Sequence, residues 1–285
     1  MSHCSKTKIV VFDLDETLGY FSEFGMVWEA VSSYISKNNS NSNRESEQES
    51  NQESNQESNQ ELFNNLLDLF PEFLRPNIFF ILEYLKRKKI KSKCNKLILY
   101  TNNQGPKEWA KSIIEYFEMK TNYKLFDQII AAYKINGEQV EMCRTTYSKT
   151  HDDLLKCTKL SSNTEICFLD DIYHPGMDNE KIYYINVKAY KHDLSFFEII
   201  KRLVQSNLIN IFNETEFKEE ISKKLIRYHY TPKYKTSDEQ NIDKIISKRI
   251  MHLLKDFFND LPKKNKINKT KKRNKTIKNK TIKLK

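Results

Sequence analysis

The segment Lys8 to Leu18 constrains the fold of this chain more than any other. Four apolar residues, Ile9 to Phe12, run directly into two carboxylates, Asp13 and Asp15. A short continuous apolar run predicts a strand that is buried on both faces, as in a parallel sheet. Alternate residues of an extended segment point the same way, so both carboxylates are predicted to face one point. That point lies at the carboxyl edge of the sheet, where open α/β sheets place their ligands. Burying two carboxylates costs several kcal/mol unless a cation or hydrogen bonds compensate.

A second apolar segment, Leu97 to Tyr100, predicts another buried strand that ends in polar residues. Thr101 and Asn102 follow it directly, and Gly105-Pro106 then leads into a predicted helix. The amino end of a helix attracts anions. This segment therefore predicts an anion-binding loop at the same edge of the sheet.

Two further segments carry charged residues at predicted element ends. Lys149 stands just before a predicted helix, with Thr150 and Asp153 spaced as a capping box. The apolar run that ends at Leu169 leads into the adjacent carboxylates of Asp170 and Asp171. Two adjacent carboxylates repel each other, so a cation between them and Asp13 would explain their placement.

These segments, in this order, resemble the haloacid-dehalogenase (HAD) superfamily of phosphatases. Asp13-Leu14-Asp15-Glu16-Thr17 resembles its first motif, D-x-D-x-T. The other matches are Thr101 for the second motif, Lys149 for the third, and the pair Asp170-Asp171 for the fourth. The resemblance implies an α/β, Rossmann-like, three-layer sandwich with a mostly parallel sheet, a small hairpin instead of a large cap, and added C-terminal helices.

The resemblance also implies a mechanism. It gives Asp13 the role of a nucleophile that forms an aspartyl-phosphate, which divides a very slow hydrolysis into two displacements. It gives Asp15 the role of the acid that protonates the leaving oxygen and of the base that activates water.

The resemblance assigns the binding groups as well. Thr101, Asn102 and Lys149 would hold the phosphate, the loop residues through a hydroxyl and a backbone N–H. A hard cation with oxygen ligands, Mg²⁺, is expected. The metal ligands it implies are Asp13, Asp15 through its carbonyl, and Asp170 or Asp171.

A narrower resemblance points to the RNA polymerase II C-terminal-domain phosphatases and the NLI-interacting-factor-like family, over about residues 8–203. It rests on Asp13-Leu14-Asp15-Glu16-Thr17-Leu18, Leu74-Arg75-Pro76, Tyr147-Ser148-Lys149, Phe168-Leu169-Asp170-Asp171 and His174-Pro175. That family removes phosphate from phosphoserine or phosphothreonine of proteins. It has a small hairpin, and Asn136-Gly137 is a hairpin turn signal. A phosphoprotein substrate is therefore implied.

Two departures leave other substrates open. The family usually has Asp-Asn where this chain has Asp170-Asp171. The stretch Thr101-Asn102-Asn103-Gln104-Gly105 is closer to the T-N-Q stretch of HAD polynucleotide 3′-phosphatases and of small-sugar or histidinol phosphatases. One alternative is thus a nucleic-acid-end or small-metabolite phosphatase. Another is a catalytically weak HAD-fold binding protein that uses its basic tail.

The sequence predicts five regions. They are residues 1–35 with the first motif and a flap, a disordered insertion at 36–61, the rest of the HAD-like domain at 62–205, a helical extension at 206–262, and a disordered basic tail at 263–285. The aromatic residues of 19–35 equally suit a helix that packs against a core. The insertion repeats Glu-Ser-Asn-Gln and contains no apolar residue, so it cannot offset the entropy of ordering by burial.

Positive charge is concentrated at the end of the chain. Of the 48 Lys and Arg residues, 12 lie between Lys263 and Lys285, where there is no acid, and the formal net charge is +10. Nonspecific contact with nucleic acid, or targeting to the nucleus, is expected from such a tail. It contains no aromatic residue, so base stacking is not expected. The basic stretch from Lys86 to Lys96 is interpreted as a solvated connection.

The five cysteines show no C-x-x-C spacing, which favours reduced thiols and an intracellular protein. No apolar run approaches the 18 residues of a membrane span, and no secretory signal begins the chain. A soluble intracellular protein without a membrane partner is expected.

Overall fold

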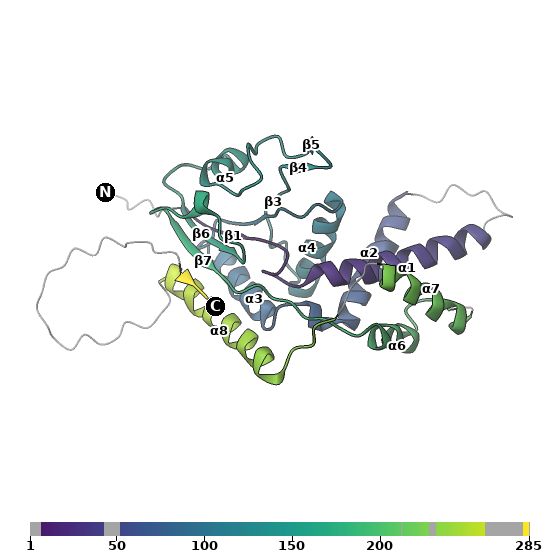
Figure 1. Cartoon of the computed structure of the whole chain (residues 1–285). Coiled ribbons are helices and arrows are strands. Elements are labelled where there is room, and N and C mark those ends of the chain that lie inside the picture. The colour runs from purple at the N-terminus through teal and green to yellow at the C-terminus, as the bar shows by residue number, and fades with distance from the viewer. Residues whose placement is uncertain (1–6, 43–51, 212, 228–231, 260–281, 285) are drawn as a thin grey trace, which may run out of the picture. The chain divides into compact units, whose positions relative to one another are not determined.

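The computed structural model describes residues 7–42, 52–211, 213–227, 232–259 and 282–284. The chain forms two compact units (Figure 1). The first comprises residues 1–18, 75–190 and 241–285, and the second comprises 19–74 and 191–240. One HAD-like domain was expected over 1–35 and 62–205, whereas the structure places 19–74 with 191–240 in a separate unit.

The first unit is built on a six-stranded sheet with the order β3-β2-β1-β6-β7-β8. Every neighbouring pair of these strands is parallel. The strands are β1 (Lys8–Phe12), β2 (Lys96–Tyr100), β3 (Gln128–Ile130), β6 (Glu165–Asp170), β7 (Ile182–Asn186) and β8 (Ile282–Lys283). The central strands are buried on both faces, which is why they are continuous apolar runs.

Helices flank the sheet (Figure 1). They are α3 (Ile78–Ile90), α4 (Lys107–Thr121), α5 (His151–Thr158) and α8 (Ser237–Phe257). Leu154 of α5 packs into one core cluster with alternate residues of the strands, among them Ile9, Val11 and Phe168. The prediction of an α/β fold with a parallel sheet flanked by helices is confirmed, and the arrangement is compatible with a Rossmann-like three-layer fold.

The strand order brings the predicted site residues to one edge. Strand β1 lies between β2 and β6, and all three point the same way. Their carboxyl ends carry Asp13, Thr101 and Asp170, which are far apart in sequence. Because the chain leaves β1 toward β2 and later returns to its other side at β6, this edge is a topological switch point, where such sheets bind ligands.

A small hairpin follows β3, as predicted. Strands β4 (Lys134–Ile135) and β5 (Glu138–Gln139) are antiparallel. Asn136 and Gly137 form the turn with φ values of 51° and 87°. Positive φ at both positions is the requirement of a tight hairpin turn, which Asn-Gly meets at little cost.

The second unit is helical in the part that the structure describes. It contains α1 (Phe21–Ser42), α2 (Gln52–Leu69), α6 (Phe196–Ser206) and α7 (Glu214–Arg227). Phe63 lies between Phe24 and Trp28, with ring centroids 5.1 and 5.2 Å away. Tyr34 meets Phe217 at 4.8 Å. The aromatic residues expected in a flap or a helix therefore include buried residues of α1, such as Phe24 and Tyr34.

The insertion at 36–61 differs from the expectation of disorder where it is described. Residues 36–42 continue α1 and residues 52–61 begin α2, while 43–51 lie outside the described residues. Each helix has a buried apolar part, around Phe24 in α1 and around Phe63 in α2. Adding turns to an existing helix costs little, and the Gln and Glu residues of 52–61 are good helix formers.

The basic tail also differs from expectation at its described end. Ile282 and Lys283 pair with Ile185 and Asn186 as the outermost strand, while 260–281 lie outside the described residues. The backbone N–H of Leu284 donates to Asn186 O at 2.8 Å. A sheet edge offers backbone partners to an extended segment whatever its side chains.

The cysteines depart from the prediction of fully reduced thiols. Cys143 and Cys157 form a disulfide with their Cα atoms 5.0 Å apart. Cys94 and Cys167 are free and buried, and Cys4 lies outside the described residues. Within the described ranges no helix combines the length and the apolar character that crossing a bilayer requires.

Candidate active site

The acidic loop begins where β1 ends. The backbone N–H of Asp13 still pairs with β6, donating to Leu169 O at 2.9 Å. Glu16 then has a φ of 58°, in the left-handed region, and the N–H of Leu18 returns to Leu14 O at 2.9 Å. This tight reversal turns the carboxylates of the loop back over the strand end.

Arg75 binds the backbone of this acidic loop. Its guanidinium donates to Glu16 O and Thr17 O at 2.5 Å each, and to Lys188 O at 3.0 Å. The side chain is 1% exposed, although Arg is rarely buried this completely. It also lies over the ring of Tyr190, 5.5 Å from the centroid. A buried cation with three carbonyl partners fixes the backbone that carries Asp13 and Asp15.

Lys149 occupies the centre of the cluster. Its Nζ donates to Oδ1 of Asp13 and to Oδ2 of Asp170, the latter at 2.7 Å. It precedes α5, whose cap Thr150 accepts from the N–H of Asp153 at 3.1 Å, as the predicted capping box requires. Lys149 is 1% exposed, so the ammonium depends on these two carboxylates for compensation.

The pair at the end of β6 is held by separate contacts. Oδ1 of Asp170 accepts from the N–H of Ile172 at 2.8 Å. The hydroxyl of Thr17 donates to Oδ1 of Asp171 at 3.2 Å and accepts from the backbone N–H of Asp171 at 3.1 Å. The amide of Asn186 donates to both backbone carbonyls of the pair at 3.0 Å. The two carboxylates therefore point in directions set by the fold.

His174 links the third and fourth motifs. Its Nδ1 accepts from the N–H of Lys149 at 3.4 Å, and its Nε2 lies 3.4 Å from Oδ2 of Asp170. His174 thus connects the backbone of Lys149 to the carboxylate of Asp170, which the side chain of Lys149 also binds.

The loop after β2 supplies the remaining polar groups. Thr101 is buried, and its Oγ1 accepts from the N–H of Asn103 at 3.0 Å. The amide of Asn103 donates to Oδ2 of Asp15 at 2.7 Å, and its Oδ1 accepts from the N–H of Gly105 at 2.7 Å. Asn103 is therefore the partner of Asp15, while the other carboxylate oxygen of Asp15 is buried without a partner among the described residues.

Arg144 ties the segment that carries Lys149 to this loop. Its guanidinium donates to Thr101 O at 3.1 Å, Ala131 O at 2.8 Å and Tyr147 O at 3.0 Å. The side chain is 1% exposed. The second and third motifs are therefore joined through one buried arginine.

Burial dominates the electrostatics of the site. It raises the pKa of Asp13 well above its ordinary value, although Lys149 opposes this shift. It raises the pKa of Asp15, partly offset by the hydrogen bond from Asn103. Burial and the neighbouring carboxylate of Asp170 raise the pKa of Asp171 to about 6.

Lys149 compensates only part of this negative charge. Burial would raise the pKa of Asp170, but Lys149 and His174 outweigh it and lower that pKa. Burial would likewise lower the pKa of Lys149, but the attraction of Asp13 and Asp170 raises it. One lysine thus faces several carboxylates, and the site favours an additional positive charge.

Three of these carboxylates could hold a metal ion. Asp13, Asp170 and Asp171 each place an oxygen within 4.8 Å of the others. They come from the ends of two adjacent parallel strands, so the sheet itself fixes their separation.

The structure brings nearly all the predicted site residues together at this edge. Asp13, Asp15, Thr101, Lys149, Asp170 and Asp171 are joined by the contacts above. The side chain of Asn102 makes no such contact among the described residues. Asn103, Arg75, Arg144 and His174 were not singled out from the sequence as site residues. A signal existed for Arg75, Asn103 and His174, which lie within stretches quoted for the family resemblances, but not for Arg144.

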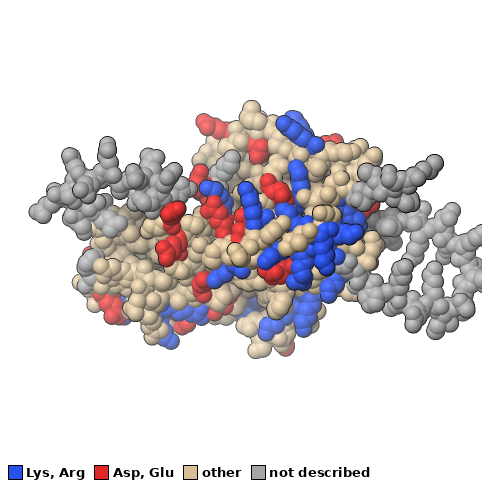
Figure 2. Space-filling view, turned by 180° about the vertical axis from the view of Figure 1, so that it is seen from behind, with Lys and Arg blue, Asp and Glu red and all other residues tan. Residues whose placement is uncertain are grey.

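A separate basic surface lies near the carboxyl end of α3, before the amino end of β2. Six of the eight residues from Lys86 to Lys93 are Lys or Arg. Lys86 and Lys89 contact Glu83 and Asp127, but the exposed side chains of Arg87, Lys91 and Lys93 have no acidic partner in the described part of the chain. Figure 2 shows Lys and Arg side chains gathered on one face. The expected solvated loop is in part the last turn of a helix.

No protein-family model matches this chain, and no curated protein matches it.

Proposed function

We propose that this chain is a Mg²⁺-dependent phosphatase that acts through an aspartyl-phosphate, on phosphoserine or phosphothreonine of a protein. One observation carries the proposal. Lys149 donates to both Asp13 and Asp170, which joins the first, third and fourth motifs in one buried cluster. Buried clusters of charged groups with perturbed pKa values occur preferentially at functional sites.

In the first step, a carboxylate oxygen of Asp13 attacks phosphorus and the bond from phosphorus to the leaving oxygen breaks. Asp15 donates its proton to that oxygen, so the alcohol leaves neutral. The raised pKa of Asp15 supports this role, because it keeps more of the acid protonated near neutral pH. Asn103 holds the carboxyl group of Asp15 through its hydrogen bond at 2.7 Å.

In the second step, water attacks the phosphorus of the aspartyl-phosphate. Asp15, now ionised, takes a proton from the water, and the bond between phosphorus and Asp13 breaks to release inorganic phosphate. Lys149 carries a positive charge beside Asp13 throughout and neutralises phosphoryl oxygens. Thr101 contributes its hydroxyl to the same oxygens.

The donor set fits a hard divalent cation. Asp13, Asp170 and Asp171 offer only oxygen, and their excess negative charge remains after Lys149 is counted. Mg²⁺ prefers such ligands. When bound, it would offset the negative charge of the phosphoryl group and lower the repulsion between that group and Asp13.

The small hairpin supports a protein substrate. Between β3 and α5 the described elements are only β4 and β5, of two residues each, so no cap domain is inserted at this point of the chain. A phosphorylated side chain on a polypeptide needs an approach that a large cap would block. The resemblance to phosphatases of the RNA polymerase II C-terminal domain favours the same substrate class.

Hydrolysis of p-nitrophenyl phosphate tests the activity, with Mg²⁺ or with a chelator. We expect turnover that requires Mg²⁺ and is lost in Asp13→Asn. A phosphoserine peptide and a 3′-phosphate oligonucleotide then test the substrate class. Preference for the oligonucleotide would favour the nucleic-acid-end alternative, and preference for neither would favour a small metabolite. Absence of turnover on all three would favour the binding-protein alternative.

A second function is favoured by the basic surface on α3. We propose that Arg87, Lys91 and Lys93, together with the basic tail, contact nucleic-acid phosphates without reading sequence. Their charges have no acidic partner among the described residues, so contact with phosphate would release counterions. This function is compatible with the phosphatase, because these residues precede the amino end of β2, while the catalytic groups follow its carboxyl end.

A further inference from the structure

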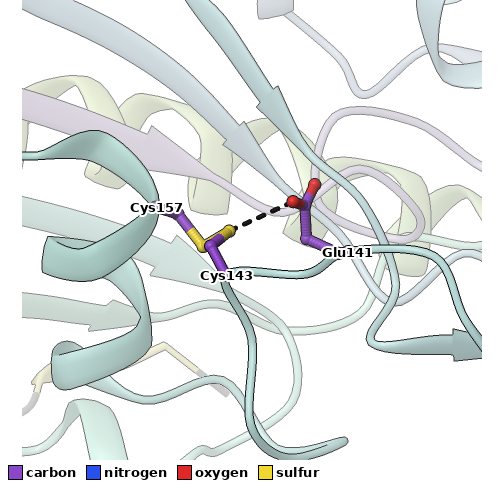
Figure 3. A group of neighbouring side chains, drawn as sticks. All are labelled: Glu141, Cys143 and Cys157. Carbon is purple, nitrogen blue, oxygen red and sulfur yellow. Dashed lines mark hydrogen bonds between the residues drawn. A yellow bond between two sulfur atoms is a disulfide. The ribbon is translucent and has the colours of Figure 1, made fainter.

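A second cluster of potential metal ligands lies outside the active site. Glu141 and Cys143 follow the β4–β5 hairpin, and Cys157 belongs to α5. Their carboxylate and sulfur atoms all lie within 4.8 Å of one another. Figure 3 shows the two sulfurs joined and the carboxylate of Glu141 directed at them.

The carboxylate of Glu141 is held beside the disulfide. Oε1 of Glu141 lies 3.1 Å from Sγ of Cys143, although a disulfide sulfur carries no proton. The other carboxylate oxygen accepts from the N–H of Ala131 at 3.2 Å, so the carboxylate is held in this direction. A carboxylate is therefore already held beside the sulfur that becomes a thiol on reduction.

We propose that, when the disulfide is reduced, the thiolates of Cys143 and Cys157 and the carboxylate of Glu141 bind a thiophilic divalent cation of the Zn²⁺ class. A dithiol supplies the reduction. It transfers two electrons and two protons to the cysteine pair and becomes a cyclic disulfide. The two thiols then release their protons as the metal binds.

The ligand chemistry selects this class of metal. Zn²⁺ takes sulfur and carboxylate oxygen in tetrahedral sites, and three protein ligands leave a fourth position for water. Thiolates favour Zn²⁺ over Mg²⁺, whereas the all-oxygen cluster of Asp13, Asp170 and Asp171 favours the reverse. The two clusters would therefore take different metals from the same solution.

The surrounding bonds would keep the ligands close after reduction. Arg144, next to Cys143, donates to Ala131 O and Thr101 O. Thr145 donates to both carboxylate oxygens of Asp153 in α5, at 2.9 Å each. These bonds join the loop of Cys143 to the helix of Cys157 without involving sulfur. The two thiols would thus remain within reach of one ion.

Co²⁺ is the probe that distinguishes this site. The full chain is reduced with dithiothreitol, freed of reductant without oxygen, and titrated with Co²⁺. We expect the intense near-ultraviolet absorption of thiolate-bound cobalt, saturating at one equivalent, and its loss on adding Zn²⁺. The all-oxygen cluster cannot give this absorption, and the unreduced chain is expected to give none. Reduced protein without the absorption would overturn the proposal and leave a purely structural disulfide.

Matched variants assign the ligands. Cys143→Ser and Cys157→Ser should each weaken the sulfur absorption and shift it, whereas Cys94→Ser and Cys167→Ser should leave it unchanged. Glu141→Gln keeps both thiols and the disulfide, so it remains informative if a cysteine variant fails to fold. We expect it to weaken Co²⁺ binding at least about tenfold. Equal binding in Glu141→Gln, or loss in the Cys94 and Cys167 variants alone, would contradict the assignment.

Discussion

The side-chain amide of Asn103 donates a hydrogen bond to Oδ2 of Asp15 at 2.7 Å. The same side chain accepts from the N–H of Gly105, so its orientation is fixed from both ends. The other carboxylate oxygen of Asp15 has no partner among the described residues. Asp15, the proposed general acid and base, therefore depends on Asn103 for the orientation of its carboxyl group.

Asn103→Ala should lower kcat by about 10- to 100-fold with little change in KM, because the general acid loses its orientation. The Asn103 hydrogen bond lowers the pKa of Asp15, so its removal should move the alkaline limb of the pH–rate profile, where the general acid loses its proton, to higher pH. Steady-state kinetics on a phosphoserine peptide across pH measures both effects. Asn102→Ala is the matched control and should leave the profile in place. An unshifted limb in Asn103→Ala would count against the assigned role of Asp15.

Asp171→Asn should raise stability near neutral pH when no divalent cation is present. The folded protein raises the pKa of Asp171 from 3.8 to about 6, so it binds a proton that the unfolded chain has released. The free energy of unfolding therefore falls as the pH rises between these values. Because the carboxyl is partly exposed, we expect a cost of about 1–2 kcal/mol in the wild type.

Urea unfolding in a chelator, at pH values below and above this window, measures the difference. The variant should be more stable than the wild type only above the window. Equal stability of the two proteins at both pH values would show that Asp171 is not strained by burial and by Asp170. Adding Mg²⁺ should stabilise the wild type more than the variant, because the variant lacks one of the proposed ligands.

Arg75→Ala should lower the free energy of unfolding by about 3 kcal/mol or more, since it leaves the buried carbonyls of Glu16, Thr17 and Lys188 without a donor. Arg87→Ala removes an exposed arginine of α3 and should change stability by only about 0.5 kcal/mol. Chemical denaturation of both variants gives the comparison. Similar small losses in both would mean that Arg75 does not support the acidic loop.

The combined change Arg87→Gln, Lys91→Gln and Lys93→Gln should weaken nucleic-acid binding and make it less dependent on salt. Each lost phosphate contact reduces the slope of log K against log salt by about 0.9, or by up to about 3 in total. A fluorescence titration of a labelled duplex at several salt concentrations measures this slope. Lys218→Gln, Lys223→Gln and Arg227→Gln on α7 provide a charge-matched control. An identical slope in the α3 variant and the wild type would exclude this surface.

Much of the fold followed from apolar runs that end in polar residues. The strands that end before Asp13, Thr101 and Asp171 were predicted because parallel strands buried on both faces leave a continuous apolar signal. The cap of α5 at Thr150 was predicted because a capping box is a local pattern. These features depend on residues that are close together in the sequence, so they can be predicted from one sequence.

The other contacts of the site depend on how loops and distant segments are arranged in space, which one sequence does not reveal. Asn103, rather than Asn102, meets Asp15 because of how the loop turns after Thr101. The Cys143–Cys157 bond depends on the hairpin returning beside α5. The helical ends at 36–42 and 52–61 were missed because the burial argument ignores that a helix already nucleated by packing extends cheaply.

The most direct test is to trap the phosphorylated aspartate. In Asp15→Asn the first step still proceeds with p-nitrophenyl phosphate, whose leaving group needs no proton, while hydrolysis of the intermediate loses its base. We expect a burst of one nitrophenolate per enzyme, followed by slow turnover. Borohydride added during the burst should convert position 13, and no other aspartate, to homoserine in a peptide digest analysed by mass spectrometry. A burst with no homoserine at position 13, or with homoserine at another position, would contradict Asp13 as the nucleophile.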